Sequence, residues 1–141
     1  LENAHYASAR FNRGRVHQRL GHAAAAIADY DGISYAHYFS SGNFGTATSG
    51  LHHAYTLLQN RNHSSTCGHS HKRDLKFKDS SHPNGVIGLV AGCYKGAAEG
   101  WAGQANKEWW SGIVVKREVD NGMYDPEFVS QSRLKAMYGQ T

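Results

Sequence analysis

The chain has 141 residues, a formal net charge of +4 with its ten histidines neutral, and two cysteines. This length predicts one globular domain over residues 1–141, because it is too short for two ordinary domains. With 40% hydrophobic and 18% charged residues, the composition excludes a disordered chain, and no apolar run approaches the roughly 20 residues of a membrane span. The basic charge predicts acidic partners: an anionic cell-wall polymer, a membrane surface or nucleic acid.

The first half of the chain predicts two helices separated by a strand. Apolar residues at three- and four-residue spacing predict a helix over residues 15–30, ended by an Asp-Gly pair. The tyrosine-rich, alternating stretch 33–40 predicts a strand. A second apolar stripe predicts a helix over residues 46–60 with Thr46 as its N-cap.

Two strands and a third helix are predicted next. Leucine and phenylalanine alternate with lysine over residues 73–79, the pattern of a half-buried strand. The apolar run 86–94 predicts a strand buried at the centre of the sheet. Small and aromatic residues recur every four positions over 97–109, which predicts a helix that buries Trp101 and leaves Trp110 partly exposed.

The end of the chain completes the predicted fold. The stretch GIVVKREV, residues 112–119, predicts a strand, and Asp125-Pro126 predicts the start of a last helix. The order of elements is therefore helix, strand, helix, strand, strand, helix, strand, helix. This order favours an α+β fold, a single-domain α/β sandwich in which helices pack on an antiparallel-rich sheet.

The polar run NRNHSSTCGHSHKR, residues 60–73, admits three hypotheses, and the first is a metal site. Imidazole nitrogen and thiolate sulfur suit zinc or copper, and His63, Cys67, His69 and His71 offer both. The spacing does not repeat the two-ligand knuckle of structural zinc sites, so the leading hypothesis assigns no metal.

The second hypothesis is a metal-dependent nuclease. In residues 51–72, two histidines, an asparagine and a later histidine resemble the nucleases of His-Asn-His type. The resemblance implies His53 as general base, Asn62 as the residue that orients it, and His71 as ligand of a divalent metal cofactor, with nucleic acid as substrate. This is the alternative function, and whether the protein is an enzyme stays open.

The third hypothesis is a secreted protein with one disulfide bond. Cys67 precedes one predicted strand and Cys93 ends the next, so a hairpin would bring the two thiols near one another. Two buried, free thiols are the alternative for a cytosolic chain. Asn62 opens an N-glycosylation sequon, which favours secretion.

A wider pattern covers residues 31–92. It consists of a tyrosine-containing strand that ends in Ser-Gly, a Thr-Ala helix start, a Cys-Gly pair and a glycine-rich apolar strand. The positions that carry it are Gly32, Tyr35, Gly42, Thr46, Ala47, Cys67, Gly68, Gly85 and Gly92. The pattern resembles that of small secreted fungal proteins related to killer toxins. The resemblance implies an extracellular α/β sandwich that acts on target cells without an active site.

The leading hypothesis is therefore a secreted, basic, toxin-like or effector-like protein without a cofactor, which binds a target cell surface or a host component such as a host protein. Exposed histidines gain charge on acidification, so binding to anions should strengthen from about pH 7 to about pH 5 and weaken with salt. The basic pairs Lys72-Arg73 and Lys116-Arg117 fit either a processing protease or ordinary surface positions. The predicted contact residues are His63, His69, His71, Lys72, Arg73 and Trp110.

Overall fold

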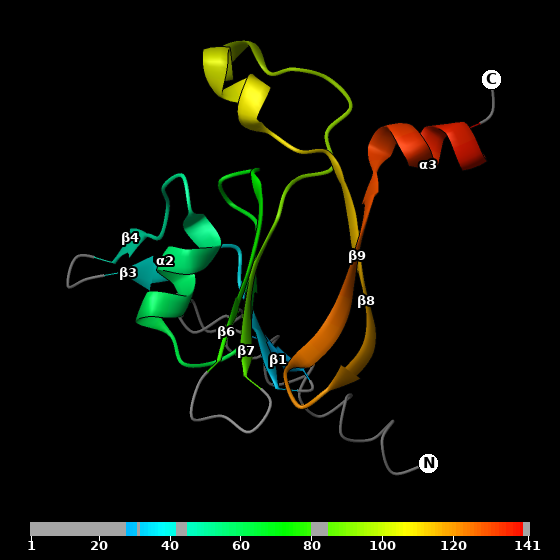
Figure 1. Ribbon diagram of the computed structural model, residues 1–141. Coiled ribbons are helices and arrows are strands. Elements are labelled where there is room, and N and C mark those ends of the chain that lie inside the picture. Colours follow the sequence, from blue (N-terminus) through cyan, green and yellow to red (C-terminus); the bar gives the residue numbers. More distant parts are fainter. Residues whose placement is uncertain (1–27, 31, 42–44, 80–84, 140–141) are drawn as a thin grey trace.

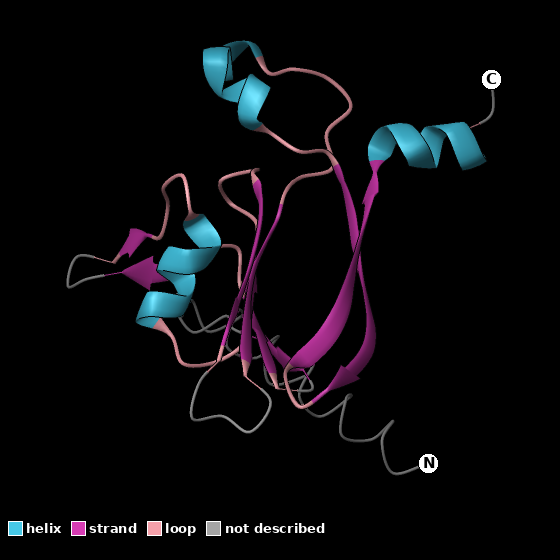
Figure 2. Cartoon of the chain, in the orientation of Figure 1, coloured by secondary structure: helices cyan, strands magenta, loops and turns pink. Residues whose placement is uncertain are grey.

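The computed structural model describes residues 28–30, 32–41, 45–79 and 85–139, which form short helices and strands (Figure 1, Figure 2). Among these residues, no helix is long and apolar enough to cross a membrane. The elements in chain order are β1 (Ala28–Tyr30), β2 (Ile33–Tyr35), β3 (Ser40–Ser41), β4 (Thr46–Ala47), α2 (His53–Asn60), β5 (Ser65–Cys67), β6 (Arg73–Lys78), β7 (Val86–Ala91), the 3-10 helix η2 (Gly100–Glu108), β8 (Gly112–Asp120), β9 (Met123–Ser130) and α3 (Gln131–Tyr138).

The main sheet has five strands in the order β1-β2-β5-β7-β6. Its central pairings, β2 with β5 and β5 with β7, are parallel, whereas the outer pairings, β1 with β2 and β6 with β7, are antiparallel. The α+β class is thus confirmed, but the predicted antiparallel-rich sheet is wrong. The physical reason lies in the connections between strands. The chain crosses over through α2 between β2 and β5, so these two strands run parallel, and β7 lies between β5 and β6 instead of beyond β6.

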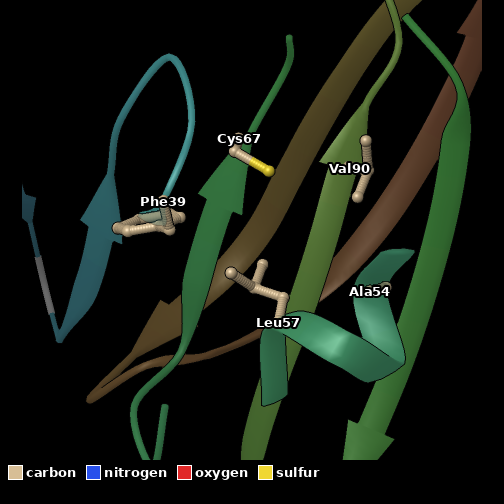
Figure 3. Close-up of a cluster of buried hydrophobic side chains, with 5 residues drawn as sticks. All are labelled: Phe39, Ala54, Leu57, Cys67 and Val90. Carbon is tan, nitrogen blue, oxygen red and sulfur yellow. The ribbon is translucent and has the colours of Figure 1, made fainter. Parts of the chain in front are cut away.

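Two different layers cover the two faces of the sheet. Figure 1 shows α2 on one side and the β8–β9 hairpin on the other. On the α2 side, Phe39, Ala54, Leu57, Cys67 and Val90 form one buried cluster, drawn in Figure 3. The hairpin side holds a second buried cluster, and its members are Ile33, Ile87, Leu89 and Tyr124. Among the described helices, only α2 therefore covers a face of the sheet, since η2 and α3 bury none of their residues.

Gly88 in the middle of β7 permits the close contact between α2 and the sheet. A Cβ atom at this position would lie 2.7 Å from the carbonyl oxygen of Ala54 and 2.8 Å from Cγ of Leu58. Both distances are shorter than a carbon atom tolerates, so the helix rests directly on the glycine backbone. This contact fixes the place of α2 above β7 and its antiparallel neighbour β6.

The predicted helix over 46–60 is shorter in the structure. Residues 46–47 form β4, where Thr46 pairs with Ser41 instead of capping a helix, and α2 begins only at His53. The side chain of its N-cap residue makes no hydrogen bond, and its first turn has no acidic residue. Asp74 of β6 takes that place: its Oδ2 accepts a hydrogen bond of 2.8 Å from the backbone N–H of Ala54.

The last predicted helix begins later than Asp125-Pro126, because residues 123–130 form β9. The Asn121-Gly122 pair has positive φ at both residues, 44° and 91°, as a tight hairpin turn requires. Proline is tolerated opposite Lys116 because a two-stranded sheet has free edges. The helix α3 starts after Ser130, whose side chain accepts a hydrogen bond from a first-turn amide.

The remaining predicted elements divide into three groups. The strands predicted over 73–79, 86–94 and 112–119 are confirmed as β6, β7 and β8, and β7 is interior to the sheet. The predicted strand 33–40 is only three residues long, as β2. The predicted helix 15–30 lies outside the described residues, except that its last three residues form β1.

Candidate functional site

The parallel strands β2, β5 and β7 end at the same edge of the main sheet. The loops that follow them carry His37, then His69 and His71, then Lys95. Backbone hydrogen bonds join these loops: the N–H of Gly68 donates to the carbonyl of His37 at 3.2 Å, and the N–H of Trp110 donates to the carbonyl of His71 at 3.0 Å. The carboxyl edge of parallel strands is where α/β folds usually bind ligands.

Three imidazoles and a phenol gather on this edge, and we call His37, Tyr38, His69 and His71 the histidine face. Nε2 of His37 and Nδ1 of His69 are 3.0 Å apart, with the two rings perpendicular at a centroid distance of 5.0 Å. The ring of Tyr38 lies 5.3 Å from that of His69. One imidazole of the bonded pair must donate and the other accept, so the pair cannot hold this bond when both rings are protonated.

The histidine face continues into the residues around η2, where Trp101 and Trp109 form what we call the tryptophan arm. His71 packs edge-on against Trp109 at 4.5 Å, and the rings of Trp109 and Trp101 lie 5.7 Å apart. The ammonium of Lys95 lies within 6 Å of both indole rings, 5.4 and 5.8 Å from their centroids, and bonds to Glu99 at 2.8 Å.

The prediction that Trp101 is buried is wrong, because 75% of its surface is exposed. The helical spacing that suggested burial does not apply, since η2 is a 3-10 helix interrupted at Gly103, where φ is 49° and ψ is −124°. Asn106 holds the arm together by donating to the carbonyls of Glu99 and Gly103. An element that buries no residue yet presents an exposed tryptophan is typical of a contact surface.

The predicted contact residue Trp110 is partly exposed, as expected, but its ring is mainly used in packing. It contacts Phe128 of β9 edge-on at 5.6 Å, and the Arg73 guanidinium lies 5.1 Å from the Trp110 ring and 5.3 Å from the Phe128 ring. These three side chains join the main sheet to the hairpin. Lys72 instead forms an ion pair with Glu108 at the end of η2, beside the tryptophan arm.

The run 60–73 is not one loop, because β5 passes through its middle. His69 and His71 follow β5, whereas Asn62 and His63 precede it and lie at the opposite edge of the sheet. The predicted cluster of three loop histidines is therefore divided, and the structure adds His37 in place of His63. Asn62 is exposed, and its glycosylation stays a prediction.

Two residues of the nuclease alternative, His53 and Asn62, lie at opposite ends of α2. His53 is completely buried; its Nδ1 lies 3.0 Å from Oγ of Ser70 and its Nε2 lies 3.9 Å from Sγ of Cys67. Burial lowers the pKa of His53, and the nearby Asp74 carboxylate opposes this shift. Asn62 lies beyond the other end of α2, about 12 Å away along the helix axis. A base in this position has no access to a phosphate.

Both cysteines are free thiols in this structure. Burial raises the pKa of Cys67 to about 12, so its thiol is neutral. The hairpin expected to join the two cysteines consists of β6 and β7, and Cys67 instead lies on β5 beside Val90 of the parallel strand β7. Because Cys93 follows Val90 by three residues, a bond requires movement of the chain after β7. The disulfide bond stays a prediction.

Metal ligation was the first hypothesis for this segment. Among the residues that the structure describes, no group of three or more His, Cys, Asp or Glu side chains is placed to hold a metal ion. The four side chains of the metal hypothesis do not share one place. His63 precedes β5 and bonds to the carbonyl of Ser64 at 2.9 Å, whereas His69 and His71 follow β5. Cys67 is buried, with 2% of its surface exposed.

The burial of Lys116 is a feature that sequence reasoning missed. Its Nζ donates to Oη of Tyr35 at 3.0 Å and to Oγ1 of Thr66 at 2.6 Å, and it lies 4.2 Å and 4.4 Å from the ring centroids of Tyr35 and Tyr124. Burial lowers the pKa of Lys116 to about 7. In the folded protein the Lys116-Arg117 pair therefore lies within a β-strand with its lysine half-buried.

A comparison of the chain with protein-family models, with curated proteins and with solved structures finds no match.

Proposed function

We propose that the protein is a secreted, basic, toxin-like or effector-like protein that acts by binding to an anionic component of a target cell surface, with the histidine face and the tryptophan arm as its contact surface. The single observation that supports this proposal most strongly is the convergence of three histidines and an exposed tryptophan at the carboxyl edge of three parallel strands. The resemblance of residues 31–92 to killer-toxin-related proteins also motivates the proposal, although its Thr46-Ala47 helix start is the strand β4 in the structure.

Electrostatics support a binding function at this edge. At neutral pH, Lys72 and Lys95 are each paired with a glutamate, so the histidines supply the charge that can change. Burial and the nearby Lys95 lower the pKa of His71, with smaller contributions from the other two histidines of the face, while Glu99 opposes this shift. His71 therefore gains its charge at a lower pH than an ordinary histidine of pKa about 6.5.

Binding rather than catalysis is favoured by the burial of two side chains that could otherwise act as a base or a nucleophile. A general base and a thiol nucleophile must reach a substrate, yet His53 and Cys67 are 0% and 2% exposed. Their pKa shifts keep His53 uncharged and Cys67 protonated near neutral pH. His53 instead holds Ser70 of the loop after β5 through a hydrogen bond, and its other ring nitrogen contacts Cys67.

The experiment measures binding to immobilised polygalacturonate and, separately, to vesicles containing phosphatidylserine. Affinity should increase about tenfold between about pH 7 and about pH 5, and should fall as salt rises from about 50 to about 300 mM. A triple substitution to Gln at His37, His69 and His71 should remove most of the pH response. The matched control is His63→Gln, because His63 lies at the opposite edge of the sheet.

The proposal would be abandoned if the triple variant kept the pH response of the native protein. Retained binding to vesicles but not to polygalacturonate would identify the membrane as the target, and the reverse would identify the polymer. Cleavage of plasmid DNA that depends on added magnesium would instead favour the nuclease alternative.

A further inference from the structure

Strand β6 is the outermost strand on one side of the main sheet. It therefore forms a lateral edge, which is distinct from the carboxyl edge that carries the histidine face. Among the described residues it pairs with β7 along one side only. An edge strand presents a row of backbone N–H and C=O groups, which another extended segment can pair with. The residues at its end, Lys76, Phe77 and Lys78, are exposed, so this edge is accessible along half of its length.

A groove lies beside this edge, between β6 and α2. Its volume is about 200 Å³, and its surface is mostly apolar. Tyr55 on its rim is 50% exposed, whereas Leu58 at its base is 2% exposed. We call it the edge groove, and its lining residues are Tyr55, Leu58, Gln59, Lys76, Phe77 and Lys78.

The two charged residues that line the edge groove, Lys76 and Lys78, are both positive. Asp74 and Lys78 contact the backbone of α2 through hydrogen bonds to Ala54 and Leu58, so alternate residues of β6, including Lys76, face the helix. Arg73 lies on the other face, over the hairpin. The carboxylate of Asp74 already accepts the N–H of Ala54, so the lysines beside the groove attract an acidic ligand.

We propose that β6 and the edge groove bind an extended, acidic peptide segment of a partner protein, which adds a strand to the sheet. Its backbone pairs with β6, one apolar side chain enters the groove between Tyr55 and Leu58, and its carboxylates lie at Lys76 and Lys78. Strand addition of this kind takes its affinity from main-chain hydrogen bonds and its specificity from side-chain pockets. The surface is separate from the histidine face and does not depend on the proposed function.

A second copy of this chain fits the edge poorly. When two β6 strands pair antiparallel about their midpoints, Lys78 lies opposite Arg73, and like charges directly across a sheet destabilise the pairing. Lysines on an edge strand are a usual device against self-association. The same lysines attract a strand of opposite charge, which is why the proposal names an acidic peptide as the occupant.

The first test uses a synthetic decapeptide with acetylated and amidated ends, in which a central Val-Phe-Val is flanked by glutamates. Its binding to the full chain is measured by fluorescence anisotropy. Two further peptides are N-methylated at alternate residues, one at odd and one at even positions. Because a paired strand uses only the N–H groups on one of its edges, one methylated peptide should bind at least about tenfold more weakly and the other should bind nearly as well.

The second test changes the protein. Lys76→Glu and Tyr55→Ala should each weaken peptide binding about tenfold. Lys107→Glu is the matched control for charge, since Lys107 is exposed on η2, and Leu51→Ala is the control for apolar surface, since Leu51 is 78% exposed outside the groove. Both controls should leave binding unchanged. Circular dichroism confirms that the variants are folded.

Three results would overturn the proposal: no binding of the unmethylated peptide, an equal loss with both methylated peptides, or binding that Lys76→Glu leaves unchanged. Concentration-dependent dimerisation that Lys76→Glu alters would assign the edge to a second copy instead. Polygalacturonate binding should fall less with Lys76→Glu than with Lys107→Glu, because Lys107 lies on η2 beside the tryptophan arm, whereas Lys76 lies on β6. Failure of the peptide test therefore leaves the histidine-face proposal untouched.

Discussion

Replacing Lys116 by Met tests whether this lysine carries a destabilising charge. The Lys116 ammonium lies between the main sheet and the β8–β9 hairpin, bonded to two hydroxyl groups, and none of the ion pairs between described residues includes it. Methionine has a similar length and no charge. The substitution removes the cost of burying the ammonium but also removes two hydrogen bonds.

The expected magnitude follows from the pKa of Lys116, which falls from 10.5 to about 7 on folding. Below pH 7 both the folded and the unfolded protein hold this proton, so the cost of burial is present in full. Between pH 7 and 10.5 the unfolded state binds more protons, so the native protein becomes more stable as the pH rises. Each pH unit contributes about 1.4 kcal/mol, and partial solvent access reduces the gain from pH 6 to pH 9 from about 2.7 to about 1.5 kcal/mol.

The assay is urea unfolding followed by tryptophan fluorescence, for the native protein and the variant, at about pH 6 and about pH 9. From pH 6 to pH 9, the free energy of unfolding of the native protein should rise by about 1.5 kcal/mol relative to that of Lys116→Met. Subtracting the free energies of unfolding of the native protein and the variant at each pH cancels the contribution of every other titrating group that the substitution leaves unchanged. Lys107→Met, at an exposed position on η2, should show no such difference.

An equal stability difference between native protein and Lys116→Met at both pH values would refute the reasoning. It would mean that the ammonium is as well solvated in the folded protein as in the unfolded chain. An acidic partner, which would raise the folded pKa of Lys116 above 10.5, would give the same result, because the folded and unfolded states would then both hold the proton from pH 6 to pH 9.

Three further predictions concern packing, exposure and thiol state. Gly88→Ala should destabilise the protein by about 2 kcal/mol because its Cβ would meet α2, whereas Gly100→Ala, with open space around it, should change stability by less than about 0.5 kcal/mol in urea unfolding. Among single-tryptophan variants, the one that retains Trp101 should be quenched most strongly by iodide, since 75% of its surface is exposed; a protected Trp101 would contradict the structure. Iodoacetamide should modify Cys93 in the folded protein and Cys67 only after unfolding. If the intact mass is instead about two mass units below that of the dithiol form, and reduction restores it, the two cysteines form a disulfide bond.

Some parts of the fold follow from local sequence patterns. Alternation over residues 73–79 and the apolar run 86–94 predicted β6 and β7, because side-chain burial on a strand repeats every two residues. Other local signals competed with one another. Asn121-Gly122 is a strong hairpin signal and Asp125-Pro126 a strong helix signal, and in the structure the hairpin prevailed because β9 pairs with β8 along most of its length.

The candidate site was only half predictable, for a reason that lies in the chain topology. The polar run 60–73 drew attention to His69 and His71, but nothing in that run points to His37, which lies 32 residues before His69 in the chain. The two meet because β2 and β5 are parallel, and parallel strands need a long crossover that no local pattern records.

What the sequence by itself determined is the basic charge, the α+β class and the strands whose burial pattern is local. Only the tertiary structure decided which strands are parallel, which lysine is buried and which histidines share an edge. The exposure of Trp101 is also known only from the structure. The four-residue spacing predicted burial on one face of an α-helix, and a 3-10 helix does not have that period. The physical reason is common to all of these: pairing and burial depend on residues far apart in the chain, whereas periodicity and turn signals depend on near neighbours.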